Sequence, residues 1–296
     1  MSTLPSRRDR GRNKRKNWLL PVLLTLLLVG VVAGGWVLAA YFTPGSNQNI
    51  LLMGVDQEGM RTDVLVLAHI NPREKKVNLL SIPRDTLVEI DCGKREVCVT
   101  PDKMNHAHAY GGVDLTVDTV EHFLGVKVDG YVKVNFEGFQ SLVDGLGGVD
   151  LLIDKDMNYE DPYAKPPLQI HFKAKAEPQH LDGKQALEYV RYRGNTGDIG
   201  RIEHTKRFFQ AVASKAEKSG TAKLASLAPG MMKYVDTKLD LSTAVRLAKL
   251  ATEVKMDQIR METIPGQDFT MKDGRWVWQA DPAKTTELRD ELFELK

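Results

Sequence analysis

The side chains best suited to chemistry in this sequence follow predicted strands or begin predicted helices. Asp56 follows an apolar strand predicted over residues 49–55, and Arg84 with Asp85 follows Pro83 at the end of a strand predicted over 77–82. Ligands usually bind at the carboxyl ends of strands in open α/β sheets, so these positions predict a binding site. The charged groups at element ends are Asp56, Arg61, Asp63, Arg84, Asp85, Lys103, Arg191, Arg193, Asp198 and Arg201.

This set of charges suits phosphoryl transfer. Two acids after neighbouring strands, Asp56 and Asp63, are able to hold one hard cation through carboxylate oxygens. The guanidinium group binds phosphate through its planar fork of donors, so several arginines and a lysine in one space suit a diphosphate. Phosphoryl transfer needs a metal and cations that neutralise charge on the phosphoryl oxygens and the leaving group.

Each residue also has a purely structural interpretation. Arg84 and Asp85 fit a turn in which the two charges satisfy each other, and Asp56 and Asp63 fit turn or cap positions. Asp198 fits the cap of a following helix. Lys103, Arg191 and Arg193 fit solvated helix ends. His106 and His108, two positions apart, do not share a helix face. Any one of these interpretations is reasonable alone, but all of them together are much less so.

The elements that must position these residues predict an α/β fold, with a central mixed sheet flanked by helices on both faces. The first three strands, separated by short connections, predict an antiparallel meander. A charged hairpin is expected over residues 87–99, and loops over 154–167 and 194–200. The predicted strands are 49–55, 64–70, 77–82, 130–134, 149–153, 169–172 and 258–264, and the predicted helices are 113–124, 135–143, 183–192, 201–218, 241–254 and 282–295.

The basic residues are concentrated at the start of the chain. Residues 1–17 hold seven Lys or Arg and one Asp, whereas the rest of the chain holds 34 basic and 38 acidic residues. This balance argues against a nucleic-acid-binding domain. The 25 residues 18–42 carry no charge, which is enough to cross the ~30 Å hydrocarbon core. The basic flank predicts a cytoplasmic tail over 1–17, a single anchor helix over 18–42 and an extracytoplasmic remainder.

The alternative for this segment is a cleaved signal peptide, because Leu38, Ala39 and Ala40 suit a peptidase site. We favour the uncleaved anchor because the apolar run is longer than a usual signal core of ~7–15 residues. The only two cysteines are Cys92 and Cys98. An oxidising compartment favours a disulfide between them over two free thiols, and no zinc-ligand spacing is present.

Several motifs occur in the order typical of the LytR-CpsA-Psr family, which this chain resembles over about residues 49–215. They lie at residues 49–56, 61–63, 79–85, 103–107, 135–139, 144–150, 186–193 and 197–201. The resemblance divides the chain into the tail and anchor, a linker over 43–48, a catalytic core over 49–219 and a segment of helices and strands over 220–296 that completes the same domain.

The resemblance implies a membrane-anchored enzyme of the bacterial cell envelope. Such an enzyme moves a glycopolymer from a polyprenyl diphosphate carrier to a hydroxyl group of peptidoglycan, with Mg²⁺ as cofactor. Asp56 and Asp63 then resemble the magnesium ligands, and the catalytic set is Arg84, Asp85 and Asp63. Asp85 is a candidate base for the acceptor hydroxyl or an orienting group for Arg84. The residues that resemble the diphosphate clamp are Arg61, Arg84, Lys103, Arg191, Arg193 and Arg201.

Two positions depart from the family pattern. His204 and Thr205 stand where the family often has arginine and glutamine, which predicts a weaker or pH-dependent grip on the diphosphate. The connection from Asp56 to Asp63 is short, which bears on the spacing of the two carboxylates. Two other functions share the same clamp: a polyprenyl diphosphate hydrolase, and a non-catalytic protein that binds the lipid carrier. A nucleotide-binding enzyme is disfavoured, since the sequence has neither a Walker loop nor a G-x-G-x-x-G loop.

Overall fold

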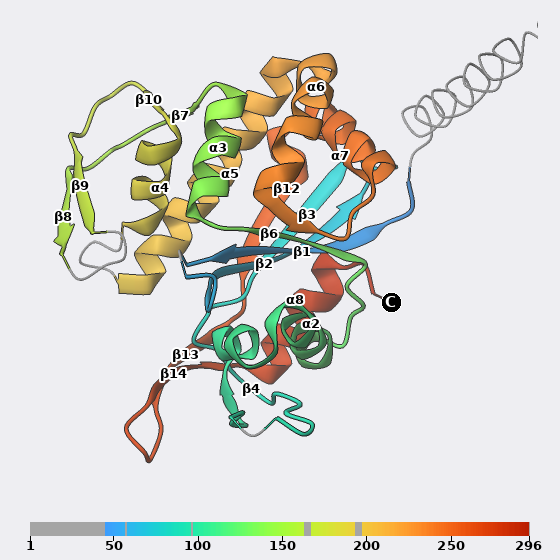
Figure 1. The fold of residues 1–296 in the computed structure, drawn as a ribbon, viewed down its shortest axis with the longest axis vertical. Helices are drawn as coiled ribbons and strands as arrows, with labels where there is room; N and C mark the ends of the chain where they lie inside the picture. The colour runs from blue at the N-terminus through green and yellow to red at the C-terminus, as the bar shows by residue number, and fades with distance from the viewer. Residues whose placement is uncertain (1–44, 57, 96, 163–166, 193–196, 296) are drawn as a thin grey trace, which may run out of the picture.

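The structure is a computed structural model, and it describes residues 45–295 except 57, 96, 163–166 and 193–196 (Figure 1). The predicted tail and anchor therefore lie outside the described residues. Within the described ranges, no helix is long and apolar enough to cross a membrane.

A six-stranded mixed sheet forms the centre of the molecule, as predicted. Its first three strands make the expected antiparallel meander, whereas β6 runs parallel to β1 and β12 runs parallel to β3. Both edge strands come from the chain beyond residue 220. In spatial order the strands are β11 (Val235–Thr237), β6 (Gly130–Val134), β1 (Gln48–Val55), β2 (Thr62–Asn71), β3 (Lys76–Ser81) and β12 (Ile259–Thr263).

Helices cover both faces of this sheet, and the alternation of side chains along β1 shows how. Leu51 and Met53 point into a core shared with α2 (Met104–Leu124) and α8 (Pro282–Leu292). Ile50 joins the opposite core, which contains Leu250 of α7 (Leu241–Glu253). Figure 1 shows α2 and α8 below the sheet and α7 above it. Apolar residues on both faces of a strand are what a sheet buried on both sides requires.

A second core lies beside the sheet, among the elements at the upper left of Figure 1. Its largest fully buried side chain is that of Tyr189. The loop predicted over 154–167 is wrong in part, because Met157–Asp161 forms a strand, β8, whose partner residues lie downstream. The elements of this region and its continuation are α3 (Phe136–Leu146), β7 (Val149–Leu151), β8, β9 (Leu168–Phe172), β10 (Gln179–Leu181), α4 (Gly183–Arg191), α5 (Gly197–Ser219) and α6 (Thr221–Met231).

The hairpin predicted over residues 87–99 is also wrong. The strand β4 (Leu87–Val88) pairs instead with β5 (Asp102–Lys103), and the segment between them contains a disulfide between Cys92 and Cys98. The disulfide prediction is therefore confirmed. A cross-link over six positions holds this short loop closed, so the chain returns to pair just after it.

Two helices begin earlier than their periodicity predicts. The helix α2 starts at Met104 rather than near residue 113, and it contains non-helical backbone at Gly111 and Gly112. Gly112 has a φ of +65°, which favours glycine, so a glycine pair that reads as a stop is a kink inside the helix. The helix α5 starts at Gly197, inside the loop predicted over 194–200.

Candidate active site

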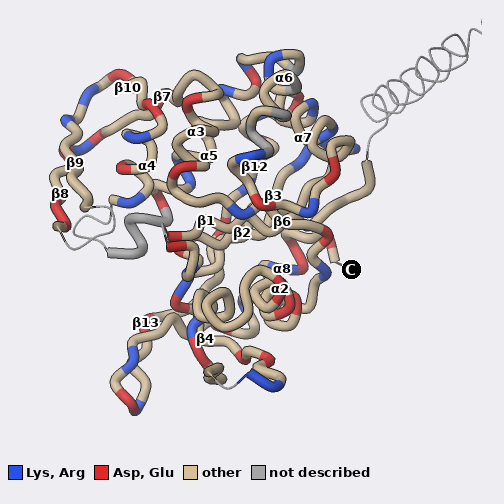
Figure 2. Tube along the Cα trace, viewed as in Figure 1, with Lys and Arg blue, Asp and Glu red and all other residues tan. Residues whose placement is uncertain are grey.

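The meander brings the ends of three strands to one edge of the sheet. Since β1 and β3 both run antiparallel to β2, their carboxyl ends meet the amino end of β2. Asp56 follows β1, Asp63 is the second residue of β2, and Arg84 with Asp85 follows β3. The topology alone therefore places these predicted side chains together, and Figure 2 shows acidic and basic segments adjoining at this end of β1 and β2.

Arg84 lies at the centre of the site. Its Nη1 donates to Oδ1 of Asp63 at 2.6 Å, and its Nε donates to Oδ2 of Asp85 at 3.3 Å. The Arg84 side chain is 21% exposed, so it is largely shielded yet still reaches solvent. A guanidinium held by two carboxylates is already oriented before a ligand binds. Less conformational entropy is therefore lost when the ligand binds.

Asp85 links Arg84 to the second cation of the site. Its Oδ1 accepts a hydrogen bond from Nζ of Lys103 at 2.7 Å, and its side chain is 9% exposed. Nζ of Lys103 also lies 5.6 Å from the ring centroid of Trp276, a cation–π contact. Both carboxylate oxygens of Asp85 thus bind cations. This arrangement identifies Asp85 as the bridge that keeps Arg84 and Lys103 side by side.

The backbone fixes the same arrangement. The amide of Met104 donates to the carbonyl of Thr86, and that of Asn105 donates to the carbonyl of Arg84. The first turn of α2 is therefore attached to the turn that follows β3. Lys103, directly before this helix, is brought to Asp85 as a result.

Asp102, the residue before Lys103, is a buried acid that no local pattern marks as part of the site. Its carboxylate is 3% exposed and accepts hydrogen bonds from Tyr110, His106 and Arg275 at 2.6–2.8 Å. Burial alone would raise the pKa of Asp102, but the hydrogen bonds from Tyr110, His106 and the Lys103 amide, together with the charge of His106, lower that pKa. Arg275 lies 173 positions further along the chain, so no local sequence pattern predicts its contact with Asp102.

Asp56 forms hydrogen bonds across the short connection between β1 and β2. Its Oδ1 accepts from the amide of Met60 at 2.9 Å and from that of Arg61 at 3.4 Å, and its own amide donates to the Arg61 carbonyl. Val55 pairs with Thr62 after an irregularity in the register. The short connection therefore keeps Asp56 next to the start of β2, where Asp63 lies, and the Arg61 side chain is exposed.

The carboxylates of Asp56 and Asp63 fit a magnesium ion in donor chemistry. Mg²⁺ prefers oxygen ligands, and it often binds one or two carboxylates together with water and substrate phosphates. Among the described residues, no group of three His, Cys, Asp or Glu side chains is arranged to hold a metal.

Of the predicted cations in the second half of the chain, Arg191 is the last residue of α4. The guanidinium of Arg191 lies 4.7 Å from the ring centroid of Phe136, the first residue of α3, two positions after β6 ends, so Arg191 is held near another strand end at this edge. Arg193 lies outside the described residues. Arg201 and Asp198 fall in the first turns of α5, where the structure describes the backbone only.

The motifs that carry the resemblance are matched by the family model described as "LytR_cpsA_psr family", which covers residues 39–294. The chain belongs to this family. The resemblance is therefore confirmed, and it extends well beyond the segment 49–215 that carries the motifs.

Curated relatives and solved structures agree with membership of the LytR-CpsA-Psr family. The chain is 35% identical over 250 residues to "Polyisoprenyl-teichoic acid--peptidoglycan teichoic acid transferase TagU" of Bacillus cereus, covering 82% of this chain and 77% of the relative. It is similar to the crystal structure of B. subtilis TagV, with a TM-score of 0.72, 29% identity, and coverage of 85% of this chain and 98% of TagV. It is also similar to TagT bound to LIIa-WTA, with a TM-score of 0.69, 30% identity, and coverage of 86% and 92%.

His204, one departure from the LytR-CpsA-Psr pattern, has a packing role in this structure. Its ring lies 5.1 Å from that of Tyr189 and 5.5 Å from that of Tyr192, measured between centroids. Its Nδ1 donates to the Tyr192 carbonyl at 3.2 Å, because a carbonyl only accepts. Burial lowers the pKa of His204, which favours the neutral ring. His204 thus packs against the end of α4. The pH-dependent binding of the diphosphate predicted from the sequence would therefore act through this packing.

Proposed function

We propose that this chain is a membrane-anchored transferase that moves a glycopolymer from a polyprenyl diphosphate carrier to a hydroxyl group of peptidoglycan. The observation that carries the proposal is the cation pair Arg84 and Lys103, held together by Asp85 where three strands end. Family membership and the printed name of TagU, a teichoic acid transferase that acts on peptidoglycan, support the same reaction class.

The reaction is a displacement at the phosphorus that bears the sugar. The acceptor hydroxyl oxygen forms a new P–O bond and gives up its proton to the solvent. The bridging P–O bond of the diphosphate breaks, and polyprenyl phosphate leaves with the electron pair. Arg84 and Lys103 would neutralise the charge that develops on the phosphoryl and leaving oxygens. Arg61, Arg191, Arg193 and Arg201 complete the proposed clamp.

Asp85 acts in this scheme as a positioning residue. Its two oxygens already accept from Lys103 and Arg84, so it holds the cations rather than waiting for the acceptor proton. Asp63 likewise orients Arg84 through Oδ1. Asp56 and Asp63 would hold Mg²⁺, which when bound supplies positive charge to the phosphate oxygens.

The proposed location follows from the chain's chemistry. A disulfide persists in oxidising compartments and is rare in the cytosol, so the bond between Cys92 and Cys98 supports an extracytoplasmic domain. The uncharged segment 18–42 would anchor this domain, and the basic tail would lie in the cytoplasm.

The test is transfer of a radiolabelled glycan from a polyprenyl diphosphate donor to a peptidoglycan fragment by the full-length protein in detergent. We expect Arg84→Ala to lower the rate roughly 10²–10³-fold, the cost of removing one charge-stabilising donor. Arg73→Ala is the matched control, because Arg73 is exposed in the turn between β2 and β3. Transfer by Arg84→Ala at the wild-type rate would contradict the proposal. Glycan phosphate released equally well without acceptor would instead identify a hydrolase.

A further inference from the structure

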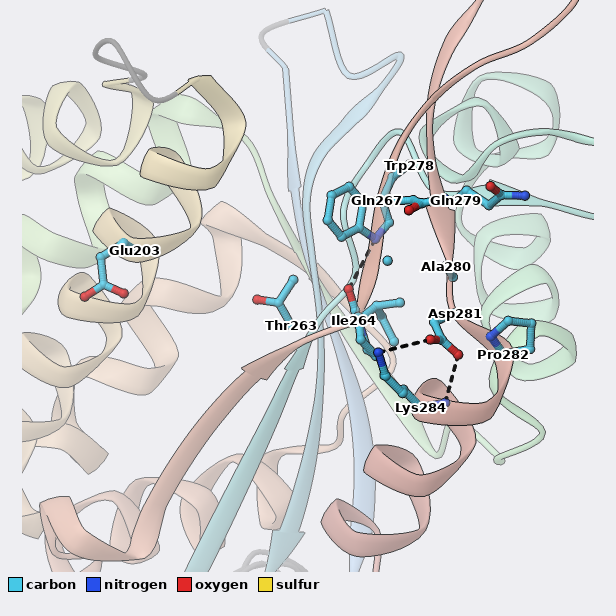
Figure 3. Close-up of a pocket in the computed structure, with 12 residues that line it drawn as sticks. Glu203, Thr263, Ile264, Gln267, Trp278, Gln279, Ala280, Asp281, Pro282 and Lys284 are labelled. Carbon is cyan, nitrogen blue, oxygen red and sulfur yellow. Dashed lines mark hydrogen bonds and ion pairs between the residues drawn. The ribbon is translucent and has the colours of Figure 1, made fainter.

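A cavity of about 740 Å³ opens beside the proposed reaction site, where β12 ends and the hairpin of β13 (Gly266–Thr270) and β14 (Trp276–Ala280) begins (Figure 3). None of the residues to which the proposed mechanism gives a role lines it. Figure 3 shows Glu203 of α5 on one side, across from the hairpin and the start of α8. The side chains that characterise the cavity are Glu203, Gln267, Trp278, Gln279, Asp281 and Lys284.

Trp278 gives the cavity a fixed aromatic wall. Its indole Nε1 donates to the carbonyl of Ile264 at 3.2 Å, and the dashed line in Figure 3 marks this bond. A Cβ at Gly266 would lie 2.7 Å from the same Nε1, so only glycine lets the ring lie this close. Trp278 is half-buried, so the rest of its surface is available to a ligand.

The charges around the cavity disfavour an anion. Lys284 is paired with Asp281 at 3.4 Å, and Asp281 also caps α8 by accepting from the Lys284 amide at 3.1 Å. The carboxylate of Asp281 therefore lies at the amino end of α8, where the helix dipole would otherwise attract a phosphate group. Glu203 contributes a second carboxylate from the opposite wall. Its Oε1 forms an ion pair with Nε of Arg207 at 3.3 Å.

The remaining polar groups suit a neutral sugar. Gln267 and Gln279 pair across the hairpin and are exposed, so their amides are able to donate to and accept from hydroxyl or acetamido groups. An aromatic face beside a few amides and carboxylates matches a pyranose ring, which has an apolar face and a rim of hydroxyl groups.

The cavity is attached to the reaction site by the backbone. The amide of Trp278 donates to the carbonyl of Asp85 at 2.8 Å, and Thr86 forms a bridge with Trp278. The strand that carries the aromatic wall is therefore bonded to the residue next to Arg84. A ligand against Trp278 would lie beside the bound diphosphate.

We infer that this cavity binds a neutral pyranose residue of the acceptor glycan and so presents its hydroxyl group to the phosphorus. The inference rests on the proposed function, which supplies the acceptor. A teichoic-acid-type donor is rich in phosphate, which this lining matches poorly because its lysine, Lys284, is already paired with Asp281. The acceptor's sugar backbone carries no phosphate. Trp278 provides the stacking surface, and the two glutamines provide hydrogen bonds.

The direct test measures binding of a soluble N-acetylglucosamine tetramer to the full-length protein in detergent by ligand-observed saturation-transfer NMR. We expect Trp278→Ala to weaken binding about tenfold or more. The double variant Gln267→Ala/Gln279→Ala, which changes only exposed side chains, provides the same test if Trp278→Ala fails to fold. Phe269→Ala is the matched control, because Phe269 is an exposed aromatic residue of the same hairpin outside the cavity lining. Unchanged binding in the folded cavity variants, or no binding by the wild type, overturns the inference.

Transfer kinetics separate this inference from the proposed function. The cavity variants should raise KM for the peptidoglycan fragment about tenfold and leave KM for the lipid-linked donor unchanged. A rise in the donor KM alone would assign the cavity to the donor and overturn the inference. A wild-type protein that binds the tetramer through Trp278 yet transfers no glycan would refute the proposed function while the sugar site stands.

Discussion

Asp85→Asn is the substitution that best separates a bridging role from a catalytic base. Asparagine keeps the shape of the side chain but removes its charge, and it replaces one acceptor oxygen with a donor amide. Either Lys103 at 2.7 Å or Arg84 at 3.3 Å then loses its acceptor. Hydrogen bonds to charged groups contribute about 1.5–3 kcal/mol each, so the free energy of unfolding should fall by about 2 kcal/mol.

The loss should stay below the ~3–5 kcal/mol of a fully buried pair, because both cations keep some contact with solvent. Their side chains are each 21% exposed, and Arg84 retains Asp63. A loss of 1 kcal/mol shifts Tm by about 2–4 °C in proteins of this size, so Tm should fall by roughly 4–8 °C. Differential scanning calorimetry measures this shift, with the exposed carboxylate substitution Glu177→Gln as control.

The same variant predicts a particular kinetic pattern. A bridge that positions Arg84 and Lys103 should raise KM for the donor and lower kcat, while the pH dependence of kcat keeps its shape. A general base contributes about 10²–10⁴-fold, so its loss would remove the acidic limb of the pH profile and leave donor KM unchanged. That second pattern, or an unchanged Tm, would refute the bridging role of Asp85.

Three further predictions concern positions around the site. Asp102→Asn should lower both kcat and the free energy of unfolding. In the wild type, the stability that this carboxylate contributes should be present above about pH 4 and lost as pH falls through its lowered pKa. Urea unfolding at pH 7 and pH 3 measures this loss. Burial lowers the pKa of His204, so the unfolded chain binds the proton more readily and stability should fall as pH drops below about 6.5. In a pH series of thermal melts, His204→Phe should flatten that fall, and a fall of the same size in the variant would exclude His204 as its source. Reduction of the Cys92–Cys98 disulfide, which joins residues six positions apart, should cost about 2 kcal/mol of stability, and equal Tm values with and without reductant would contradict this value.

Much of the site follows from local sequence patterns. Apolar runs with short polar connections predict the meander, and Pro83 ends the third strand, because proline cannot donate to a sheet. An antiparallel meander brings alternate strand ends to one edge, which is why Asp63, Arg84 and Asp85 meet as expected. The disulfide follows from there being only two cysteines.

Other features depend on contacts between distant segments. The pairing of β4 with β5, the strand β8 and the early starts of α2 and α5 differ from the predictions, because their hydrogen-bond partners or packing surfaces are set by the rest of the fold. From the sequence, His204 predicts a change in how the diphosphate is bound, yet in the structure its ring packs against those of Tyr189 and Tyr192.

The sequence by itself determined which charged residues follow strand ends, and so which residues we predict to carry the proposed chemistry, because side-chain charge and position relative to a strand end are local properties. The tertiary structure decided how they are held. Lys103 reaches Asp85 because the first turn of α2 is bonded to the turn after β3, and the preceding Asp102 is bound by the distant Arg275. The cavity beside Trp278 likewise forms where three segments converge. Long-range contacts of this kind leave no periodicity in the sequence, so they become visible only once the chain is folded.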